Sequence, residues 1–418
     1  MSETRNIIVL GASYAGLGAA HYTLKHVLPQ LPSSSGITYK LILVNPSKKF
    51  YQRHAAPRAI ASPELMPNEQ TFLDIEPGFK QYGDKFQFVL GKAVSWDTEK
   101  RTVFVKKNAG DEVALSYHAL VLATGSKTAS PTQSSWANSH EETQEALTAI
   151  HKQLKSAKSI VIAGGGPAGV ETAGELGEFL NGTAGWFQSQ PANIRVDITL
   201  LTSAKDLLPA LRPAIGKQAE TYLTRVGVTV LYNTKLQSAE PTNDGKTKIL
   251  LDNGKELTAD IYIPAMGYSP LTSYVPSHLL NPKGAVETTE TTLRVDNAGP
   301  RVYAMGDVTS FSRGGIMEII DEIPVLGTNL KRDLLAAHED VNAKPTGADR
   351  TCKPNLSETQ LVPVGRSKGV GAVLGWKLPS WAVWAIKGRD FMVSKGNDRV
   401  YGKSEEKESQ WKKSAVAA

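Results

Sequence analysis

Cysteine is nearly absent from the sequence. The 418 residues include one, Cys352, so no disulfide can form within the chain and no oxidising compartment is required. A redox-active Cys-x-x-Cys pair is excluded for the same reason. Any electron transfer by this protein therefore depends on a bound cofactor, with the protein supplying position and electrostatics.

Long apolar runs and clustered charges are also missing. No run approaches the roughly 20 residues that span a bilayer. The first residues carry no signal-peptide pattern, and Ser2 stands where a myristoylation motif has glycine. The net charge is +6, but the basic residues are dispersed, so we expect no nucleic-acid partner. These absences predict a cytoplasmic protein that is not secreted.

Catalytic histidine clusters are a further absence. His140, His151, His278 and His338 are scattered and form neither a Ser-His-Asp arrangement nor a metal-ligand set, so no metal is expected. The hydrophobic content of 41% over 418 residues is enough for two or three packed domains.

The sequence does contain a strand–turn–helix–strand pattern. Asn6–Leu10 reads as a short buried strand, Gly11–Gly16 as a glycine turn, Leu17–Leu28 as a helix and Tyr39–Asn45 as a second buried strand. Continuous apolar strands that alternate with helices indicate a parallel sheet covered on both faces.

The same pattern returns in the middle of the chain. Ser159–Ala163 is the strand, Gly164–Gly169 the turn, Val170–Leu180 the helix and Arg195–Leu201 the next strand. Two such units predict an α/β fold with two Rossmann-like dinucleotide-binding domains.

The first glycine motif departs from its usual form. It reads Gly11-x-Ser13-x-x-Gly16, with serine where glycine lets the backbone approach a pyrophosphate. The helix N-terminus still offers free N–H groups to phosphate, although a tight turn without a ligand is the alternative. Asn45 occupies the position near the end of the second strand where an acid usually binds ribose. An amide can also hydrogen-bond a ribose hydroxyl.

The second glycine motif, Gly164-x-Gly166-x-x-Gly169, is complete and favours dinucleotide binding. The strand that comes after it ends in Ser203 and Lys205 with no acid between them. A hydroxyl and an ammonium group favour a 2′-phosphate, and therefore NADPH over NADH. The alternative is that both side chains are solvated loop residues.

A later apolar strand ends at Gly306–Asp307 and gains its meaning from the order of motifs. A dinucleotide motif comes first, a strand ending at Thr124–Gly125 second, another dinucleotide motif third and Gly306–Asp307 last. This order resembles the two-dinucleotide-binding-domain flavoproteins, the fold of glutathione reductase and apoptosis-inducing factor.

Finer matches resemble the AMID and ferroptosis-suppressor branch, and its fungal members in particular, over about residues 6 to 400. The matching segments are Gly11–Gly16 within LGASYAGLGAAH, Phe50–Ala59 within NPSKKFYQRHAAPRAI, Leu122–Ser126, Gly164–Glu171, Leu208–Pro209, Thr224–Leu231 and Val364–Gly371.

The resemblance implies a domain plan and two cofactors. Residues 1–126 and 264–330 would form a discontinuous FAD-binding domain, 127–263 an NAD(P)H-binding domain, and 331–418 a small α+β C-terminal domain with a polar tail. The expected cofactor contacts are Gly11, Ala12, Ser13, Tyr14, Ala15, Gly16, Asn45, Arg58, Val94, Thr124, Gly125, Gly306 and Asp307 for FAD, Gly164, Gly166, Gly169, Ser203 and Lys205 for NAD(P)H, and Gly267.

The resemblance also implies a reaction. Glu171 matches a glutamate beside the nicotinamide, and Lys353 belongs to a Lys-Pro pair near the active site. Hydride would pass from NADPH or NADH to the flavin, and electrons from there to a quinone-type acceptor. Two other functions stay open, a redox-sensing signalling protein and an accessory oxidoreductase with a small-molecule acceptor specific to its pathway.

Three of the seven tryptophans gather near the C-terminus. Trp376, Trp381 and Trp384 are interleaved with Lys387 and Arg389. Such a segment could rest on a membrane or lipid-droplet surface near a lipophilic quinone. Packing of the third domain against the FAD domain or against a partner in a homodimer is the commoner fate of tryptophan, and is the expectation here.

Overall fold

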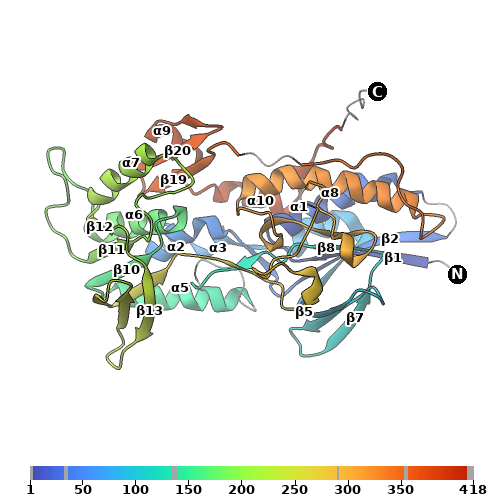
Figure 1. Ribbon diagram of the computed structural model, residues 1–418, viewed down its shortest axis with the longest axis horizontal. Helices are drawn as coiled ribbons and strands as arrows, with labels where there is room; N and C mark the ends of the chain where they lie inside the picture. Colours follow the sequence, from blue (N-terminus) through green and yellow to red (C-terminus); the bar gives the residue numbers. More distant parts are fainter. Residues whose placement is uncertain are drawn as a thin grey trace.

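The computed structural model describes residues 3–32, 36–130, 132, 139–289, 291–352 and 356–411. The molecule is elongated, with one parallel sheet near each end and the C-terminal elements along one side (Figure 1). The helices are α1 (Tyr14–Tyr22), α2 (Ala56–Ala61), α3 (Asn68–Thr71), α4 (Glu76–Phe79), α5 (His140–Leu154), α6 (Pro167–Asn181), α7 (Pro213–Thr224), α8 (Ile316–Ala336), α9 (Ser380–Val383) and α10 (Gly396–Val400).

The strands range from two to 12 residues in length. They are β1 (Glu3–Leu10), β2 (Ile37–Asn45), β3 (Lys49–Tyr51), β4 (Phe72–Asp74), β5 (Phe86–Asp97), β6 (Thr102–Lys107), β7 (Glu112–Ser116), β8 (Ala119–Leu122), β9 (Ser126–Lys127), β10 (Ser159–Ala163), β11 (Asp197–Leu201), β12 (Val228–Leu231), β13 (Leu236–Pro241), β14 (Thr247–Leu251), β15 (Glu256–Ala259), β16 (Ile261–Pro264), β17 (Ser269–Pro270), β18 (Val302–Ala304), β19 (Gln360–Val364), β20 (Lys368–Val373) and β21 (Trp376–Lys377).

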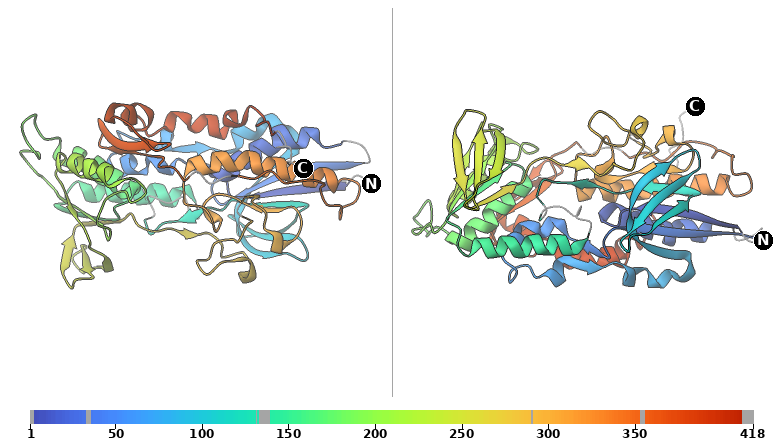
Figure 2. Two further views of the ribbon diagram at one scale, coloured as in Figure 1. Left: turned by 45° about the horizontal axis from the view of Figure 1, so that its top comes forward. Right: turned by 90° about the horizontal axis from the view of Figure 1, so that it is seen from below.

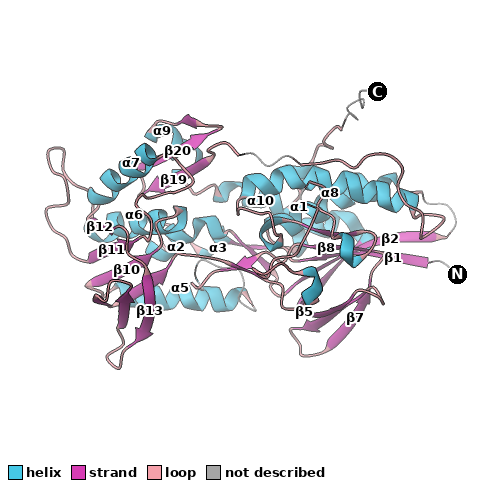
Figure 3. Cartoon of the chain, viewed as in Figure 1, coloured by secondary structure: helices cyan, strands magenta, loops and turns pink. Residues whose placement is uncertain are grey.

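The sheet near the N-terminus has the strand order β18-β8-β1-β2-β5-β6-β7. Strands β18, β8, β1, β2 and the first half of β5 run parallel, and the rest of β5 continues into an antiparallel meander with β6 and β7. Helices α1 and α8 lie together on one face of the parallel part (Figure 3). Because both faces are covered, the β1 residues Ile7–Leu10 are almost completely buried, as their continuous apolar pattern predicts.

The second parallel sheet has the order β12-β11-β10-β16, with α6 and α7 packed against its strands. A three-stranded antiparallel sheet, β13-β14-β15, projects beside it (Figure 2). The chain passes between the two units through the adjacent strands β9 and β17, which pair antiparallel. The predicted α/β fold with two Rossmann-like units is therefore confirmed.

The C-terminal segment touches both units. The sheet β19-β20-β21 and α9 lie beside α6 and α7, after which the chain returns to α1 through α10. Residue 330, where the sequence suggested a boundary, lies inside α8. The first part of the polar tail is held by ion pairs, since Glu405 is buried in one with Arg399 and Glu406 pairs with Lys25. No helix in the described residues is long and apolar enough to cross a bilayer.

Two of the C-terminal tryptophans do not pack as expected. Trp376 is 79% exposed and Trp381 is 71% exposed, although β21 pairs with β20 and α9 packs against it. The prediction that they pack the third domain against the FAD domain is therefore wrong, and packing against a partner in a homodimer stays a prediction.

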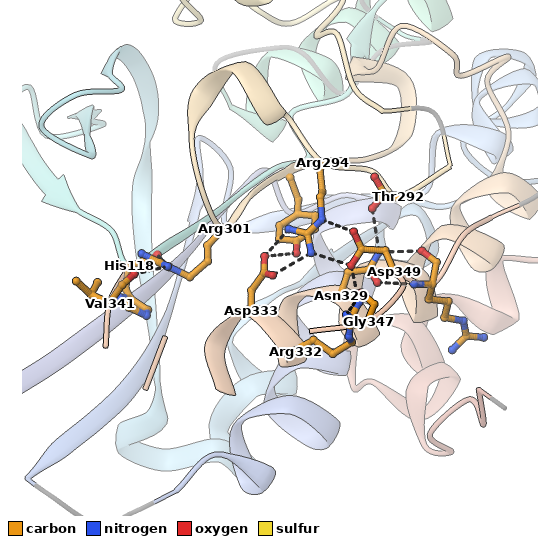
Figure 4. A network of polar contacts seen from close by, with 12 residues as sticks. His118, Thr292, Arg294, Arg301, Asn329, Arg332, Asp333, Val341, Gly347 and Asp349 are labelled. Atoms are coloured by element: carbon orange, nitrogen blue, oxygen red, sulfur yellow. Dashed lines mark hydrogen bonds and ion pairs between the residues drawn. The ribbon is translucent and has the colours of Figure 1, made fainter. Parts of the chain in front are cut away.

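A network of ion pairs anchors the chain beyond the end of α8 (Figure 4). The Arg294 guanidinium bridges Asp333 on α8 and Asp349 beyond it, with N–O distances of 2.5 and 2.8 Å. Asp349 also pairs with Arg332 at 2.5 Å. The network holds residues 349–352 along α8, so Cys352 is buried against this helix.

Candidate active site

The first glycine turn is built by contacts that exclude side chains. A Cβ added to Gly16 would lie 1.7 Å from the carbonyl oxygen of Gly11, and one added to Gly11 would lie 2.3 Å from that of Ala123. Gly11 also has a φ of +101°. Ser13 is the N-cap of α1, and its side chain makes no capping hydrogen bond. The first N–H groups of α1 are therefore available to an anion such as a pyrophosphate.

A cavity of about 350 Å³ opens at this turn. Its lining includes Gly11–Ser13, Asn45, Ala93 and Thr124. Three lysines also line it, namely Lys49, Lys92 and Lys127. Lys49 pairs with Asp74 at 3.1 Å, and the three ammonium groups at the cavity favour an anionic group such as a nucleotide phosphate. Val94 was expected to contact FAD through its backbone, and this stays a prediction. Its neighbour Ala93 lines the cavity, beside a bulge of β5 at Ala93–Ser95, and the Val94 side chain is exposed.

The Asn45 side chain serves the turn itself. Its Oδ1 accepts a hydrogen bond from the backbone N–H of Ala12 at 3.0 Å, and its Nδ2 donates to the carbonyl oxygen of Ser47 at 2.6 Å. The amide is thereby fixed at the edge of the cavity, with its remaining lone pair and N–H at the place where the ribose was expected.

Asp307 carries an unsatisfied buried oxygen. Its Oδ2 accepts hydrogen bonds from Ser126 Oγ at 2.8 Å and from Arg53 Nη2 at 2.5 Å. Its Oδ1 is buried and has no partner among the described residues. A buried carboxylate oxygen needs a donor, and a ribityl hydroxyl of FAD supplies one. The residues present therefore fit a flavin nucleotide. Gly125 and Gly306 flank this position, and both have positive φ.

The second glycine turn repeats the first. A Cβ added to Gly169 would lie 1.8 Å from the carbonyl oxygen of Gly164, and one added to Gly164 would lie 2.3 Å from that of Ala265. Gly166 is the N-cap of α6 and has open space around it. Gly267, just beyond β16, has a φ of +66° and is also open.

Ser203 and Lys205 lie just beyond the end of β11, and both are exposed. Their position beside the second turn is compatible with the expected contact to a nucleotide phosphate. Neither side chain is held by a hydrogen bond within the described residues, so both are free to turn toward a ligand.

Glu171 lies on α6 in a buried ion pair. Its Oε1 is 2.5 Å from Lys387 Nζ, which also donates to the carbonyl oxygen of Leu361 at 3.1 Å. Burial raises the pKa of the Glu171 carboxyl to about 7, although the nearby Lys387 ammonium lowers it. The group can therefore hold or release a proton near neutral pH. No pattern in the sequence identifies Lys387 as its partner.

Arg58 makes contacts that the sequence did not predict. Its guanidinium makes two hydrogen bonds to Glu175 on α6, at 2.8 and 2.9 Å, and others to the carbonyl oxygens of Gly388 and Arg389. It does not line the cavity. The packing of α2 against α6 leaves the guanidinium inside the boundary between the units, and the expected contact of Arg58 with FAD stays a prediction. Phe391 is completely buried beside it, with the Arg58 guanidinium carbon 4.7 Å from the ring centre.

His54 and Glu322 are two further polar residues near the first turn, and the sequence did not point to either. His54 Nδ1 is 2.5 Å from the hydroxyl of Tyr14, an expected cofactor contact, and burial lowers the pKa of His54 to about 4, so the ring is neutral. Glu322 on α8 accepts a hydrogen bond from the N–H of Gly306 at 2.8 Å, and burial raises the pKa of its carboxyl to about 7. Both contacts join residues that local sequence patterns do not connect.

Lys353, the second catalytic candidate, lies outside the described residues. The preceding Cys352 is described. Burial raises the pKa of its thiol to about 11, so the thiol stays protonated and unreactive at neutral pH.

Comparisons with known proteins agree with this geometry. A family model described as pyridine nucleotide-disulphide oxidoreductase matches residues 5–325. "Oxidoreductase phnG" of Penicillium herquei is 46% identical and the match covers 94% of this chain and 95% of that protein. Human "Ferroptosis suppressor protein 1" is 26% identical, over 94% and 95% of the two chains.

Among solved structures, the sulfide:quinone oxidoreductase of the hyperthermophilic bacterium Aquifex aeolicus is similar in fold. It has a TM-score of 0.68 and 16% identity, over 95% of this chain and 92% of that one. The expected resemblance to the ferroptosis-suppressor and apoptosis-inducing-factor branch, and to its fungal members, is confirmed.

Proposed function

The chain belongs to the pyridine nucleotide-disulphide oxidoreductase family, and from that premise we propose that it passes electrons from NADPH through FAD to a quinone-type small molecule. That it is an NAD(P)H-dependent flavin oxidoreductase follows from the family. The quinone and the preference for NADPH are the parts we propose.

The observation that carries the proposal is the single, buried cysteine. A disulphide-reducing member of such a family needs two thiols beside the flavin, and this chain has one, with a pKa of about 11. Electrons therefore leave by direct transfer to a bound acceptor. A quinone is suited to this route, because the overall exchange balances: NADPH, one proton and a quinone give NADP⁺ and a quinol.

The protein's own residues would divide the work between binding and proton handling. FAD, when bound, supplies a ring that accepts a hydride and releases electrons to an acceptor. Asp307 has an unpaired oxygen for a ribityl hydroxyl, and the N-terminus of α1 faces the pyrophosphate position. Glu171, held by Lys387, would orient the nicotinamide and exchange a proton near neutral pH.

The preference for NADPH rests on Ser203 and Lys205. Both are exposed just beyond β11, where a dinucleotide-binding unit presents its residues to the adenosine ribose. A 2′-phosphate would gain an ion pair with the ammonium group and a hydrogen bond with the hydroxyl.

The test is anaerobic stopped-flow absorbance of the purified flavoprotein. NADPH and NADH are mixed in separate experiments, and a water-soluble quinone is added after the flavin bleaches. We expect faster bleaching with NADPH and rapid, repeated recovery of the yellow colour with the quinone. Cys352→Ala should recover equally fast, because no thiol takes part.

Two outcomes would contradict the proposal. Recovery that is no faster with a quinone than in its absence would point to another acceptor, or to a redox sensor whose reduced form persists. Loss of recovery in Cys352→Ala would instead assign the transfer to the thiol.

A further inference from the structure

The C-terminal segment presents a cluster of exposed apolar side chains. This tryptophan surface consists of Leu374, Trp376, Trp381, Trp384 and Ile386. The residues come from the turn between β20 and β21, from β21 itself, and from α9 with the turn after it, which pack against β20. Water-exposed tryptophan is costly, so five large apolar side chains within 13 residues indicate a surface that is covered when the protein works.

The same segment carries basic residues. Residues 359–395 contain six lysines and arginines and one acidic residue, and three of the six, Arg366, Lys387 and Lys395, pair with Glu178, Glu171 and Asp398. Lys368 and Lys377 are exposed and form no ion pair within the described part of the chain. Lys377 pairs in register with Ala372 on β20, directly beside Trp376. An exposed ammonium group therefore follows an exposed tryptophan directly in β21, although successive side chains of a strand leave it on opposite sides.

This combination matches the interface of an anionic bilayer. Tryptophan is stable at the headgroup level because its ring is apolar and its indole N–H is polar, while lysine gains from the negative surface potential of the membrane. We propose that the tryptophan surface, with Lys368 and Lys377, binds the headgroup region of a bilayer that contains anionic phospholipid. Such binding is peripheral, since the segment is a short hairpin and a single helical turn.

The position of the surface gives the binding a consequence. Ile386 belongs to the tryptophan surface, and the next residue is Lys387, whose ammonium holds Glu171. A bilayer at this surface would therefore lie next to the buried Glu171–Lys387 pair. A quinone dissolved in the bilayer would then reach this pair from the membrane. This route rests on the proposed function, whereas the membrane binding does not.

The chain offers a matched control for the test. Trp186 and Phe187 are 90% and 97% exposed, on the loop after α6. The loop residues 182–194 contain no charged side chain. Arg225 lies against this loop, but its guanidinium donates to the carbonyl oxygens of Ala184, Gly185 and Gln188. The loop itself thus presents an exposed aromatic pair without a lysine, and its replacement should not affect binding to an anionic surface.

The experiment is co-sedimentation of the full-length flavoprotein with sucrose-loaded vesicles, either of phosphatidylcholine alone or of phosphatidylcholine with about 30% phosphatidylserine. We expect wild type to bind the anionic vesicles. Trp376→Ser/Trp381→Ser should weaken binding by at least about tenfold, since each side chain removes a large apolar area from the contact. Lys368→Glu/Lys377→Glu should lower binding to the anionic vesicles by more than about fivefold per site. Trp186→Ser/Phe187→Ser should bind as wild type does.

Three results would overturn the proposal. The first is equal binding of wild type to both kinds of vesicle. The second is a loss of vesicle binding in the control variant Trp186→Ser/Phe187→Ser as large as that in Trp376→Ser/Trp381→Ser. The third is no vesicle binding, combined with a dimer in solution that Trp376→Ser/Trp381→Ser converts to a monomer. The last result would assign the surface to a second copy of the chain. Turnover with a water-soluble quinone is measured on every variant, because failure of the proposed function would abolish it in wild type, and failure of membrane binding alone would leave it unchanged.

Discussion

The two glycine turns share one backbone and differ in the helices that begin at them. In both, a Cβ on the last glycine would lie less than 2 Å from the carbonyl oxygen of the first, at 1.7 and 1.8 Å. Helix α1 has no acidic residue and is buried along its whole length. Helix α6 carries Glu171, Glu175 and Glu178, which pair with Lys387, Arg58 and Arg366. The first turn is therefore a fixed support for its nucleotide, whereas the second is coupled by charge to the rest of the molecule.

We expect the largest effects from variants that each disrupt one of the two glycine turns. Gly16→Ala pushes a methyl group into the Gly11 carbonyl, so we expect the protein to purify without flavin. Gly169→Ala makes the same intrusion at Gly164, and should keep the flavin but lose its reduction by NADPH. Flavin absorbance and anaerobic bleaching measure the two effects, with circular dichroism to show that each variant is folded. Loss of flavin from folded Gly169→Ala would show that the turns are not independent.

The second prediction concerns the charges on α6. Arg58→Ala leaves the buried Glu175 carboxylate without its cation, which should lower the free energy of unfolding by about 3–5 kcal/mol. Arg366→Ala is the matched control, because Arg366 pairs with Glu178 on the same helix but is exposed, and should cost at most about 1 kcal/mol. Urea unfolding monitored by tryptophan fluorescence compares them. Equal losses would mean that the boundary between the units does not depend on the buried pair.

The third prediction uses pH. Burial raises the pKa of Glu171 to about 7 from its ordinary value near 4.5, so the neutral acid is favoured in the folded chain. Its contribution to stability is complete below the ordinary pKa and is lost as pH rises through about 7. Flavin reduction by NADPH should change by at least about tenfold with a midpoint near this pH, as expected for a positioned acid or base.

Two variants test whether Glu171 is responsible. Glu171→Gln should remove the transition from both the reduction rate and the melting temperature. Lys387→Met should move it to higher pH, since the ammonium group lowers the pKa of Glu171. If the pH midpoint of flavin reduction does not move in Lys387→Met, the Glu171–Lys387 ion pair does not determine the titration.

The two glycine turns could be predicted from the sequence, whereas the side-chain contacts around them could not. The two turns and their strands could be predicted, because buried strand, glycine turn and helix come one after another within about 30 residues, as the dinucleotide fold requires. The Gly306–Asp307 strand end could be predicted only from its place in the order of motifs. The partners of α6 could not. Glu171 and Lys387 are 216 residues apart, and Arg58 and Glu175 are 117 apart. An arginine in a matching motif was assigned to the flavin, and only the packing of α2 on α6 reveals its glutamate.

The fourth prediction concerns the second strand of each unit, which ends at Asn45 in the first unit and is followed by Lys205 in the second. Lys205→Glu replaces an exposed ammonium group beyond β11 with a carboxylate that repels a 2′-phosphate. The ratio of flavin reduction rates with NADPH and NADH should fall by about tenfold, which corresponds to one lost charge-assisted contact. Lys255→Glu, in the turn between β14 and β15, is the control and should not change the ratio. An unchanged ratio in Lys205→Glu would remove the basis for the NADPH preference.

The smallest effect is expected at Asn45, the corresponding position at the end of β2. Asn45→Ala removes the acceptor of the Ala12 N–H, so FAD should bind with about 1 kcal/mol less free energy, roughly fivefold in Kd. Asn45→Asp restores an acceptor for that N–H and loses the donor to the Ser47 carbonyl. If Asn45 acts by holding the turn, aspartate recovers most of the affinity, as measured by quenching of FAD fluorescence. If both variants bind FAD as wild type does, the amide has no part in either turn or ribose. The first turn would then depend on its glycines alone, while the second depends on charges brought from elsewhere in the chain.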